Sequence, residues 1–217
     1  VDNTLLDNDR VTADLRNFLQ REVGVARTAR YWELFEELRE ALGYADYLGA
    51  LQRYRLEHPR DPHVLHLSHY LIEYPFANRL YPESLDVIAY LKSIGVVAIL
   101  SDGDVVFQPR KIERSGLEAA VEANVLIYVH KEQELADVES RFPGEHYLVI
   151  DDKLRILAAV KDVWRERVTT VFVRQGHYAY DEAVLARYPP ADITLDRIGE
   201  VLQLSPEVLR LAKKRST

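Results

Sequence analysis

The sequence contains no cysteine and no methionine among its 217 residues. Without cysteine, the chain can form no disulfide, no thiolate metal site and no cysteine nucleophile. Because a natural chain of this length normally carries several methionines, including an initiator, we expect that residues are missing at the N-terminus and that internal methionines are absent from the sequence. No apolar run reaches the roughly 18 residues of a membrane span, and no signal peptide opens the chain. We therefore expect a cytoplasmic protein.

Positive charge is also in short supply, since the formal net charge is −7. An excess of acidic groups argues against general binding to nucleic acids or to anionic membranes. A phosphorylated substrate would need local cations or a metal ion to offset this field. The hydrophobic content of 47% can fill a substantial core, and 29% charged residues suits an ordinary surface. The length fits one domain, or one core domain with an insertion.

From about residue 83 onward, helical patterns alternate with short apolar runs. The periodicity predicts helices in "ESLDVIAYLKSIG", in "RKIERSGLEAAVEA" with an internal Gly116, and in three later segments. The apolar runs predict strands at 96–100, 125–129, 146–150 and 168–173, with a short last strand in "DITL". Fully apolar strands separated by helices indicate an open parallel sheet covered on both faces. In such a sheet the ligand lies beyond the carboxyl ends of the strands.

Residues 9–79 differ, because they show helical patterns and no convincing strand. We predict an all-helical insertion at 9–79 within a core formed by residues 1–8 and 80–217. Its boundaries lie near residues 8–10 and 76–81, where "PFANRLYP" interrupts the helical periodicity. We therefore expect an α/β domain that carries a helical domain directly after its first turn.

Candidate polar residues follow the strands at the points where ligands bind. Asp2 lies in a turn that opens the chain, Ser101 follows the first predicted strand, and Lys131 follows the second. The pair Asp151 and Asp152 follows the third strand. An acidic residue after a strand more often caps a helix than takes part in catalysis. The combination of an acid, a hydroxyl, a lysine and an acid pair on one sheet edge is more specific than any single residue.

This set resembles the motifs of the haloacid dehalogenase (HAD) superfamily, whose members are mostly Mg²⁺-dependent phosphatases. Val1, Asp2, Asn3 and Thr4 would complete the first motif, D-x-D-x-T, if an aspartate preceded Val1. Ser101 matches the hydroxyl of the second motif, Lys131 the lysine of the third, and Asp151 with Asp152 the acidic fourth. The helical insertion falls between motifs one and two, where the family places a cap. The resemblance implies a Rossmann-like parallel sheet core with a helical cap.

The resemblance also implies roles for individual residues. The aspartate before Val1 would be a nucleophile that forms an aspartyl-phosphate, and Asp2 would be the general acid and then the base. Mg²⁺ takes about six oxygen ligands, which the nucleophile, the backbone carbonyl of Asp2, Asp151, Asp152, the phosphate and water would supply. Side chains or amides that would bind the substrate belong to Thr4, Ser101, Asp102, Gly103 and Lys131.

Two lysines compete for the role of the third motif. Lys111 lies about ten residues beyond its strand and within a helical pattern, so we expect it to be a solvated helix position. Lys131 directly follows a strand, and we favour it. Glu132 stands where the family often has proline, and Ile156 and Leu157 replace a polar residue of the fourth motif. Gln175 and His177 also follow a predicted strand and are weaker candidates.

We predict a phosphatase for a small phosphorylated metabolite, acting as a monomer or homodimer and binding neither nucleic acid nor membrane. A 2-haloacid dehalogenase would use the same aspartate without a metal, although the acid pair Asp151 and Asp152 argues against it. A sugar phosphotransferase would retain every motif and differ only in excluding water. If no aspartate precedes Val1, the chain would be a binding module without activity.

Overall fold

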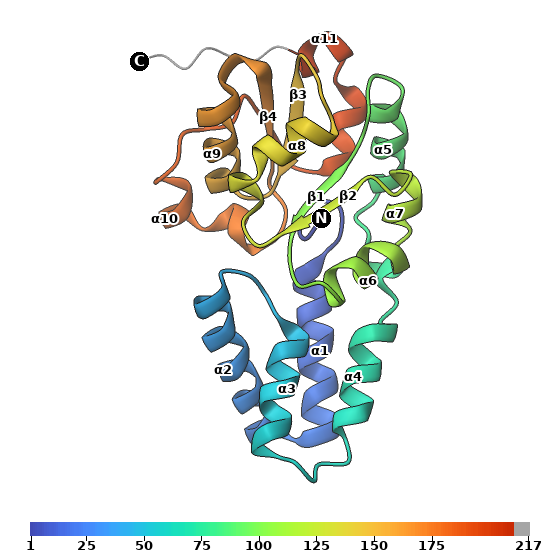
Figure 1. Ribbon diagram of the computed structural model, residues 1–217, viewed down its shortest axis with the longest axis vertical. Helices are drawn as coiled ribbons and strands as arrows, with labels where there is room; N and C mark the ends of the chain where they lie inside the picture. Colours follow the sequence, from blue (N-terminus) through green and yellow to red (C-terminus); the bar gives the residue numbers. More distant parts are fainter. Residues whose placement is uncertain (211–217) are drawn as a thin grey trace.

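The computed structural model describes residues 1–210, which form two lobes along one long axis (Figure 1). One lobe, here called the helical lobe, consists of α1 (Asn8–Val23), α2 (Val25–Leu42), α3 (Tyr47–Glu57) and α4 (Val64–Glu73). The other, the sheet lobe, contains the strands and the remaining helices, and the chain enters it through the 3₁₀ helix η1 (Phe76–Arg79). The helical lobe therefore begins one residue before the segment predicted to be helical, 9–79, and otherwise lies within it.

The helical lobe has its own apolar core. Each helix contributes buried residues at helical spacing, including Leu15, Tyr31, Tyr54 and Leu67. The Tyr31 hydroxyl donates a hydrogen bond of 2.9 Å to the carbonyl of Tyr47, so its polar end is satisfied inside this core. The lobe is thus held together by packing between its helices.

The strands of the sheet lobe all pair in parallel. Strand β1 (Ile99–Asp102) pairs with β2 (Val125–Tyr128), and β4 (Val168–Val173) lies between β3 (Tyr147–Asp151) and β5 (Ile193–Leu195). Every residue of β4 is buried, as expected for a parallel strand with helices on both faces. The prediction of a parallel α/β core is confirmed.

The helices of the sheet lobe connect these strands. In chain order they are α5 (Ser84–Lys92), α6 (Phe107–Arg114), α7 (Leu117–Ala120), α8 (Leu135–Arg141), α9 (Leu154–Trp164), α10 (Glu182–Leu185) and α11 (Pro206–Leu209), with 3₁₀ helices η2 (Lys131–Gln133), η3 (Arg165–Arg167), η4 (His177–Tyr180) and η5 (Ile198–Gln203). Within the described chain, no helix is long and apolar enough to cross a membrane.

The sheet is divided into two parts among the described residues. One part holds β1 and β2, and the other holds β3, β4 and β5. A cavity of about 930 Å³ lies between them, lined by apolar residues of both parts such as Ile99 and Val149, and by Val1 and Leu5 of the opening turn. The neighbouring edges of β1 and β3 are therefore separated by an apolar groove.

Several predicted elements have different bounds in the structure, and two of them bear on the site. The first strand was expected at 96–100 but spans Ile99–Asp102, because Ser101 and Asp102 pair with Ile127 and Tyr128 of β2. The helical pattern with Gly116 forms two helices, α6 and α7, because Gly116 adopts a φ of 82° that ends regular helix geometry. Ser101 is therefore a strand residue and not a turn residue.

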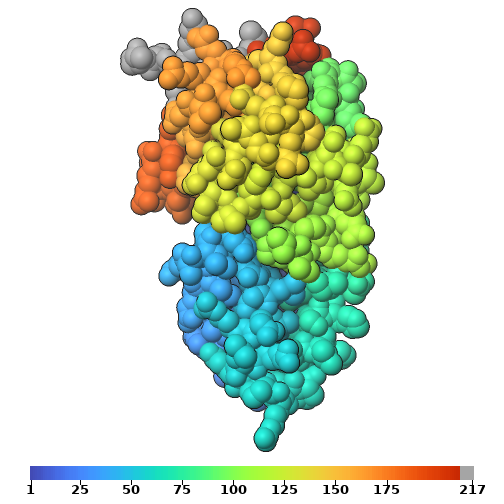
Figure 2. Space-filling view, in the orientation of Figure 1, coloured from blue at the N-terminus to red at the C-terminus, as the bar shows by residue number. Residues whose placement is uncertain are grey.

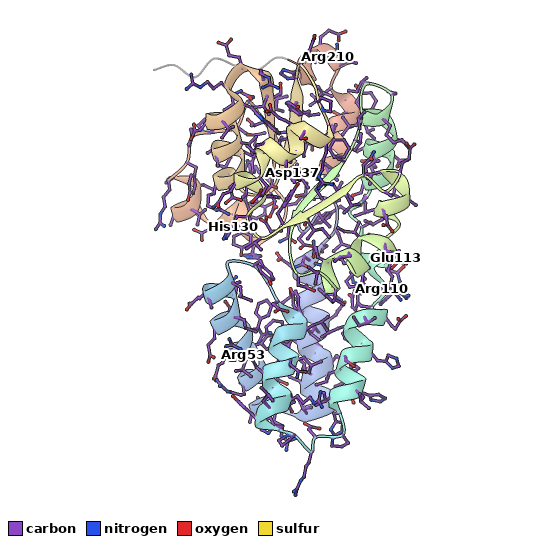
Figure 3. The ribbon with its side chains drawn as sticks, viewed as in Figure 1. Arg53, Arg110, Glu113, His130, Asp137 and Arg210 are labelled. Carbon is purple, nitrogen blue, oxygen red and sulfur yellow. The ribbon has the colours of Figure 1, made fainter. Side chains whose placement is uncertain are left out.

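Helix α6 is one place where the two lobes meet, and in Figure 2 the green part of the sheet lobe borders the blue and cyan helical lobe. The ring of Phe107 lies 4.9 Å from that of Tyr47 and 5.7 Å from that of Phe76, measured between centroids. Arg110 forms an ion pair of 2.9 Å with Glu73 of α4, and Figure 3 shows Arg110 on the side of α6 nearest the helical lobe. Helix α6 of the sheet lobe is thus packed directly against α3 and α4 of the helical lobe.

Candidate active site at the carboxyl ends of the strands

The opening turn places Asp2 and Thr4 beside the acid pair that follows β3. The Val1 carbonyl accepts hydrogen bonds from the amides of Thr4, Leu5 and Leu6, which closes the turn. Asn3 adopts a φ of 55° and its side-chain oxygen accepts from the Asn8 amide at 3.0 Å. The turn is therefore fixed to the first residue of α1, and its Thr4 hydroxyl reaches Asp152 at the end of β3.

Asp151, the last residue of β3, is buried and fully engaged. Its Oδ2 accepts from the Nζ of Lys131 at 2.6 Å, and its Oδ1 accepts from the Lys153 amide at 2.9 Å. Burial alone would favour the neutral acid, but the Lys131 ammonium reverses this and lowers the pKa of Asp151. Asp151 is therefore held ionised, with both oxygens bound by the protein.

Asp152 is buried beside it and is only partly engaged. Its Oδ1 lies 3.3 Å from the Thr4 hydroxyl, while its Oδ2 is buried and has no hydrogen-bond partner in the protein. Burial and the neighbouring Asp151 carboxylate raise the pKa of Asp152 to about 7. A buried oxygen without a partner is costly. This oxygen therefore fits a cation ligand.

The backbone carbonyl of Asp2 lies near the same point. The Thr4 hydroxyl is 3.4 Å from this carbonyl oxygen and 3.3 Å from Asp152 Oδ1, so both oxygens surround one hydroxyl. Hard oxygen ligands of this kind suit Mg²⁺. Within residues 1–210, no three His, Asp or Glu side chains are arranged to hold a metal ion. The donors that fit a metal here are thus one carboxylate and one carbonyl, with Asp151 already bound to Lys131.

The Asp2 side chain points toward α6. Its Oδ1 accepts from the Nζ of Lys111 at 2.7 Å, and its Oδ2 lies 3.3 Å from the Nε2 of Gln108. Although burial works against the charged form, the Lys111 ammonium lowers the pKa of Asp2 below its ordinary value. The expectation that Lys111 is a solvated helix position is wrong, because its side chain is 1% exposed and bound to Asp2.

Residues of the second motif line the next strand end. Ser101 is buried, and its hydroxyl accepts from Gln108 Nε2 at 2.9 Å. Asp102 Oδ1 accepts from the Lys131 amide at 2.7 Å, and burial raises the pKa of Asp102. The Gly103 amide donates to the Tyr128 carbonyl at 3.0 Å, so this amide is occupied by main-chain pairing. A phosphate-binding role for Gly103 stays a prediction.

Lys131 opens η2 directly after β2 and is buried. Burial alone would lower the pKa of Lys131, but the Asp151 and Asp102 carboxylates raise it. The ammonium is therefore held in its charged form among acidic groups at the sheet edge.

The structure brings the predicted residues of four separate segments to one edge of the two sheets. The opening turn supplies Asp2 and Thr4, the end of β1 supplies Ser101 and Asp102, and η2 supplies Lys131. The acid pair at the end of β3 completes the cluster through the Thr4 and Lys131 contacts. The roles assigned to these residues stay predictions, but their convergence follows from the parallel topology.

Two further residues belong to the cluster: Gln108 was missed by the sequence reasoning, and Lys111 was considered there but set aside in favour of Lys131. Gln108 and Lys111 lie three positions apart on α6, so both reach the site from one helix face. Their signal was two polar residues at i and i+3 on a helix that follows the second motif. Gln175, a weaker candidate, is buried and donates to the Thr4 carbonyl at 3.1 Å. His177 lies at the edge of the lobe, where its Nδ1 is 2.6 Å from Asp9 Oδ1.

Comparison with known proteins identifies the family. The parallel sheets, the helical lobe after the first turn and the acidic strand ends define a parallel α/β fold with an inserted helical lobe. The model of the haloacid dehalogenase-like hydrolase family matches residues 1–163. A crystal structure of a haloacid dehalogenase-like hydrolase from Burkholderia xenovorans LB400 is 59% identical, with a TM-score of 0.90 over 94% of this chain and 95% of that chain. This chain belongs to the haloacid dehalogenase-like hydrolases.

More distant structures share the fold alone. The HAD-hydrolase YfnB from Bacillus subtilis, described as bound to magnesium, has 15% identity and a TM-score of 0.62 over 94% of each chain. A haloacid dehalogenase-like family hydrolase from Xanthomonas campestris has 16% identity and a TM-score of 0.62 over 96% of this chain and 88% of that chain. No curated protein matches the chain significantly.

Proposed function

We propose that this hydrolase is a Mg²⁺-dependent phosphatase that removes phosphate from a small phosphorylated metabolite through an aspartyl-phosphate intermediate. The observation that carries the proposal is the buried Oδ2 of Asp152, which has no partner in the protein. The other oxygen of the same carboxylate lies 3.3 Å from the Thr4 hydroxyl, which is itself 3.4 Å from the Asp2 carbonyl. A metal-free reaction leaves the Asp152 Oδ2 unexplained, whereas a hard cation would satisfy it. Asp102 is a second carboxylate near this point, and a divalent cation would balance the negative charge of both.

The nucleophile in this proposal is an aspartate directly before Val1, as the family motif implies. The backbone nitrogen of Val1 lies close to Asp2, Asp151, Asp152 and Lys131. A carboxylate on the preceding residue would therefore start close to the lysine and to the acid pair. This placement supports the proposal.

The reaction would proceed in two steps. A carboxylate oxygen of the nucleophile attacks phosphorus, the bond from phosphorus to the ester oxygen breaks, and Asp2 gives a proton to the departing alcohol. Asp2 then takes a proton from water, whose oxygen attacks the aspartyl-phosphate and releases inorganic phosphate. Lys131 offsets negative charge on the phosphate and carboxylates, and the Ser101 hydroxyl binds a phosphate oxygen.

The residues that would hold Mg²⁺ are Asp152, the Asp2 carbonyl and the nucleophilic carboxylate. Asp151 is bound by Lys131 and the Lys153 amide, so it would support the site through water. When bound, the metal would draw charge from the transferring phosphoryl group. The fold neighbour from Bacillus subtilis is described as bound to magnesium, which is consistent with this site.

The remaining features of the proposal concern the whole protein. The helical lobe would act as a cap over the strand ends and contribute to substrate choice. We propose a cytoplasmic enzyme, monomeric or homodimeric, with a small phosphorylated substrate and no nucleic-acid or membrane partner. A 2-haloacid dehalogenase is the nearest alternative, but it does not explain the unpartnered Asp152 oxygen.

The test is a comparison of two reactions on the full-length gene product. We expect phosphate release from p-nitrophenyl phosphate and from small alkyl phosphates with Mg²⁺, and its loss after EDTA treatment with recovery on adding Mg²⁺. Halide release from 2-haloacids, measured on the same preparation, should stay at background. Halide release without metal would overturn the proposal in favour of a dehalogenase. Phosphate release that persists after EDTA treatment would show that the reaction needs no metal.

A further inference from the structure

Lys111 is the most deeply buried cation of the described chain that no motif explains. Its side chain is 1% exposed, and its Nζ has two polar contacts: Asp2 Oδ1 at 2.7 Å and Asn8 Oδ1 at 2.9 Å. The ammonium also lies 5.3 Å from the centroid of the Phe107 ring. A buried ammonium needs a carboxylate partner to remain charged. The contacts of Lys111 are thus directed at the first motif and at the base of the helical lobe.

Gln108 completes the hold on Asp2. Its Nε2 lies 3.3 Å from Asp2 Oδ2 and 2.9 Å from the Ser101 hydroxyl. One helix face therefore contacts both carboxylate oxygens of Asp2, and it connects them to the second motif. A carboxylate bound at both oxygens cannot rotate freely about its last side-chain bond.

The second partner of Lys111 belongs to the helical lobe. Asn8 is the first residue of α1, and its Nδ2 donates to the Tyr47 hydroxyl at 3.3 Å. The same hydroxyl is 3.0 Å from the Thr12 hydroxyl, and the Tyr47 ring packs on Phe107 of α6. A continuous set of hydrogen bonds therefore runs from Asp2 through Lys111 and Asn8 into α1 and α3.

We propose that Lys111 is a positioning residue that orients the Asp2 carboxylate toward the leaving group, and that Asn8 makes this orientation depend on the docked helical lobe. The inference rests on the proposed phosphatase function, in which Asp2 is the general acid. Lys131 cannot replace Lys111 in this task, because its Nζ is bound to Asp151. Lys111 acts only through Asp2, so its effect should follow the demand for a proton on the leaving alcohol.

The test varies the leaving group. The alkoxide of an alkyl phosphate is a poor leaving group and needs the proton from Asp2, whereas p-nitrophenolate leaves readily without one. For Lys111→Gln we expect kcat/KM on alkyl phosphates to fall about 100-fold and on p-nitrophenyl phosphate less than about 10-fold, in line with the usual contribution of general acids. Since kcat/KM covers only steps up to the first irreversible one, the later action of Asp2 on water does not enter. An equal fall on both substrates would overturn the inference.

A matched control separates this effect from damage to the fold. Lys161 is also a buried lysine in an ion pair, with 6% of its side chain exposed, and it lies away from the site. For Lys161→Met, we expect the ratio of kcat/KM on the two substrates to match that of the wild type. A change of this ratio equal to that in Lys111→Gln would show that the loss of any buried ion pair produces it, and would overturn the inference.

Asn8→Ala keeps the inference testable if the Lys111 variant does not fold. Asn8 is only partly buried, and we expect its loss to lower kcat/KM on alkyl phosphates about 10-fold, with less than about a threefold change on p-nitrophenyl phosphate. An unchanged ratio would overturn the link to the helical lobe. If the wild type releases no phosphate from either substrate, the proposed function itself fails. A uniform loss in an active protein overturns only the inference about Lys111.

Discussion

The sheet lobe contains a buried lysine–aspartate pair at each end of its strands. At the carboxyl ends, Lys131 Nζ is 2.6 Å from Asp151 Oδ2. At the amino ends, Lys161 of α9 is 2.6 Å from Asp192 Oδ2, just before β5. The two pairs have the same residue types, the same separation and similar burial, yet their surroundings differ.

The pair at the amino ends is satisfied by the protein itself. Lys161 also donates to the Val168 carbonyl at 2.8 Å, and Asp192 Oδ2 accepts from the amide and hydroxyl of Thr170 at 2.8 and 3.0 Å. These contacts lower the pKa of Asp192, although burial opposes the shift. One positive charge meets one negative charge, and their polar atoms join β4 to the start of β5. Such an arrangement supports the fold.

The pair at the carboxyl ends lies among an excess of acidic groups. Asp152 adds a carboxylate with a buried, unpartnered oxygen, and Asp102 adds another beside Lys131. The pKa values of both are raised by burial, in contrast to that of Asp192. The comparison shows that the ion pair alone does not mark a functional site. In the proposed function, the unbalanced acidic groups around the second pair distinguish it, because they would bind a ligand of positive charge.

The largest expected effect is on stability at the amino ends. Lys161→Met leaves Asp192 as a buried charge without its cation, which typically costs about 3–5 kcal/mol in free energy of unfolding. Urea denaturation should show this loss, while kcat per folded molecule stays near that of the wild type. Replacing both partners, as in Lys161→Met with Asp192→Leu, should recover part of the stability. A loss below about 1 kcal/mol would mean that this pair does not support the fold.

The reverse result is expected at the carboxyl ends. Asp152→Asn should lower kcat at least about 100-fold, equivalent to about 2.7 kcal/mol, because the amide cannot supply a charged ligand. Without metal, this variant should be at least as stable as the wild type near pH 8. Because the pKa of Asp152 is raised to about 7 in the folded state, ionised Asp152 destabilises the fold at pH values above those at which an aspartate ordinarily ionises.

The pH dependence gives this second prediction a sign. An acid whose folded pKa lies above its unfolded value loses no stability while it stays protonated, and costs stability as the pH rises through the interval between the two values. The stability advantage of Asp152→Asn should thus shrink as the pH falls from 8 toward 4, as measured by thermal unfolding in EDTA. Asp192→Asn serves as the control and should be less stable than the wild type at neutral pH. Equal behaviour of both variants would contradict the comparison.

The site residues at the carboxyl ends of the strands could be predicted from the sequence, because parallel topology fixes where strand ends lie. Lys131 and the pair Asp151 and Asp152 directly follow apolar runs, and parallel strands bring such positions to one edge. The first strand was misplaced by about three residues, because its bounds depend on pairing with β2 and not on its own apolar run. Periodicity reports burial of a segment, but pairing sets its ends.

Lys111 and Asp192 show what the sequence could not reveal. Lys111 lies in a polar helix, where a lysine is usually solvated, and its burial depends on the helical lobe and the opening turn closing over it. Asp192 precedes a short strand without any motif, and its partner Lys161 is 31 positions away. Both contacts join segments distant in sequence. Their charge balance becomes visible only when these segments are packed together.

The smallest expected effect is the response to the metal itself. A ligand that binds only the folded state stabilises it by about 1.4 kcal/mol at ten times its dissociation constant. Mg²⁺ should therefore raise the melting temperature of the wild type, because in the proposed function it would bind the Asp152 oxygen and balance the acidic groups at the carboxyl ends of the strands. Asp192→Asn should melt lower but show the same upward shift. Asp152→Asn should show almost none. A shift retained in Asp152→Asn would place the bound Mg²⁺ elsewhere, and the acidic excess at the carboxyl ends would then have no demonstrated ligand.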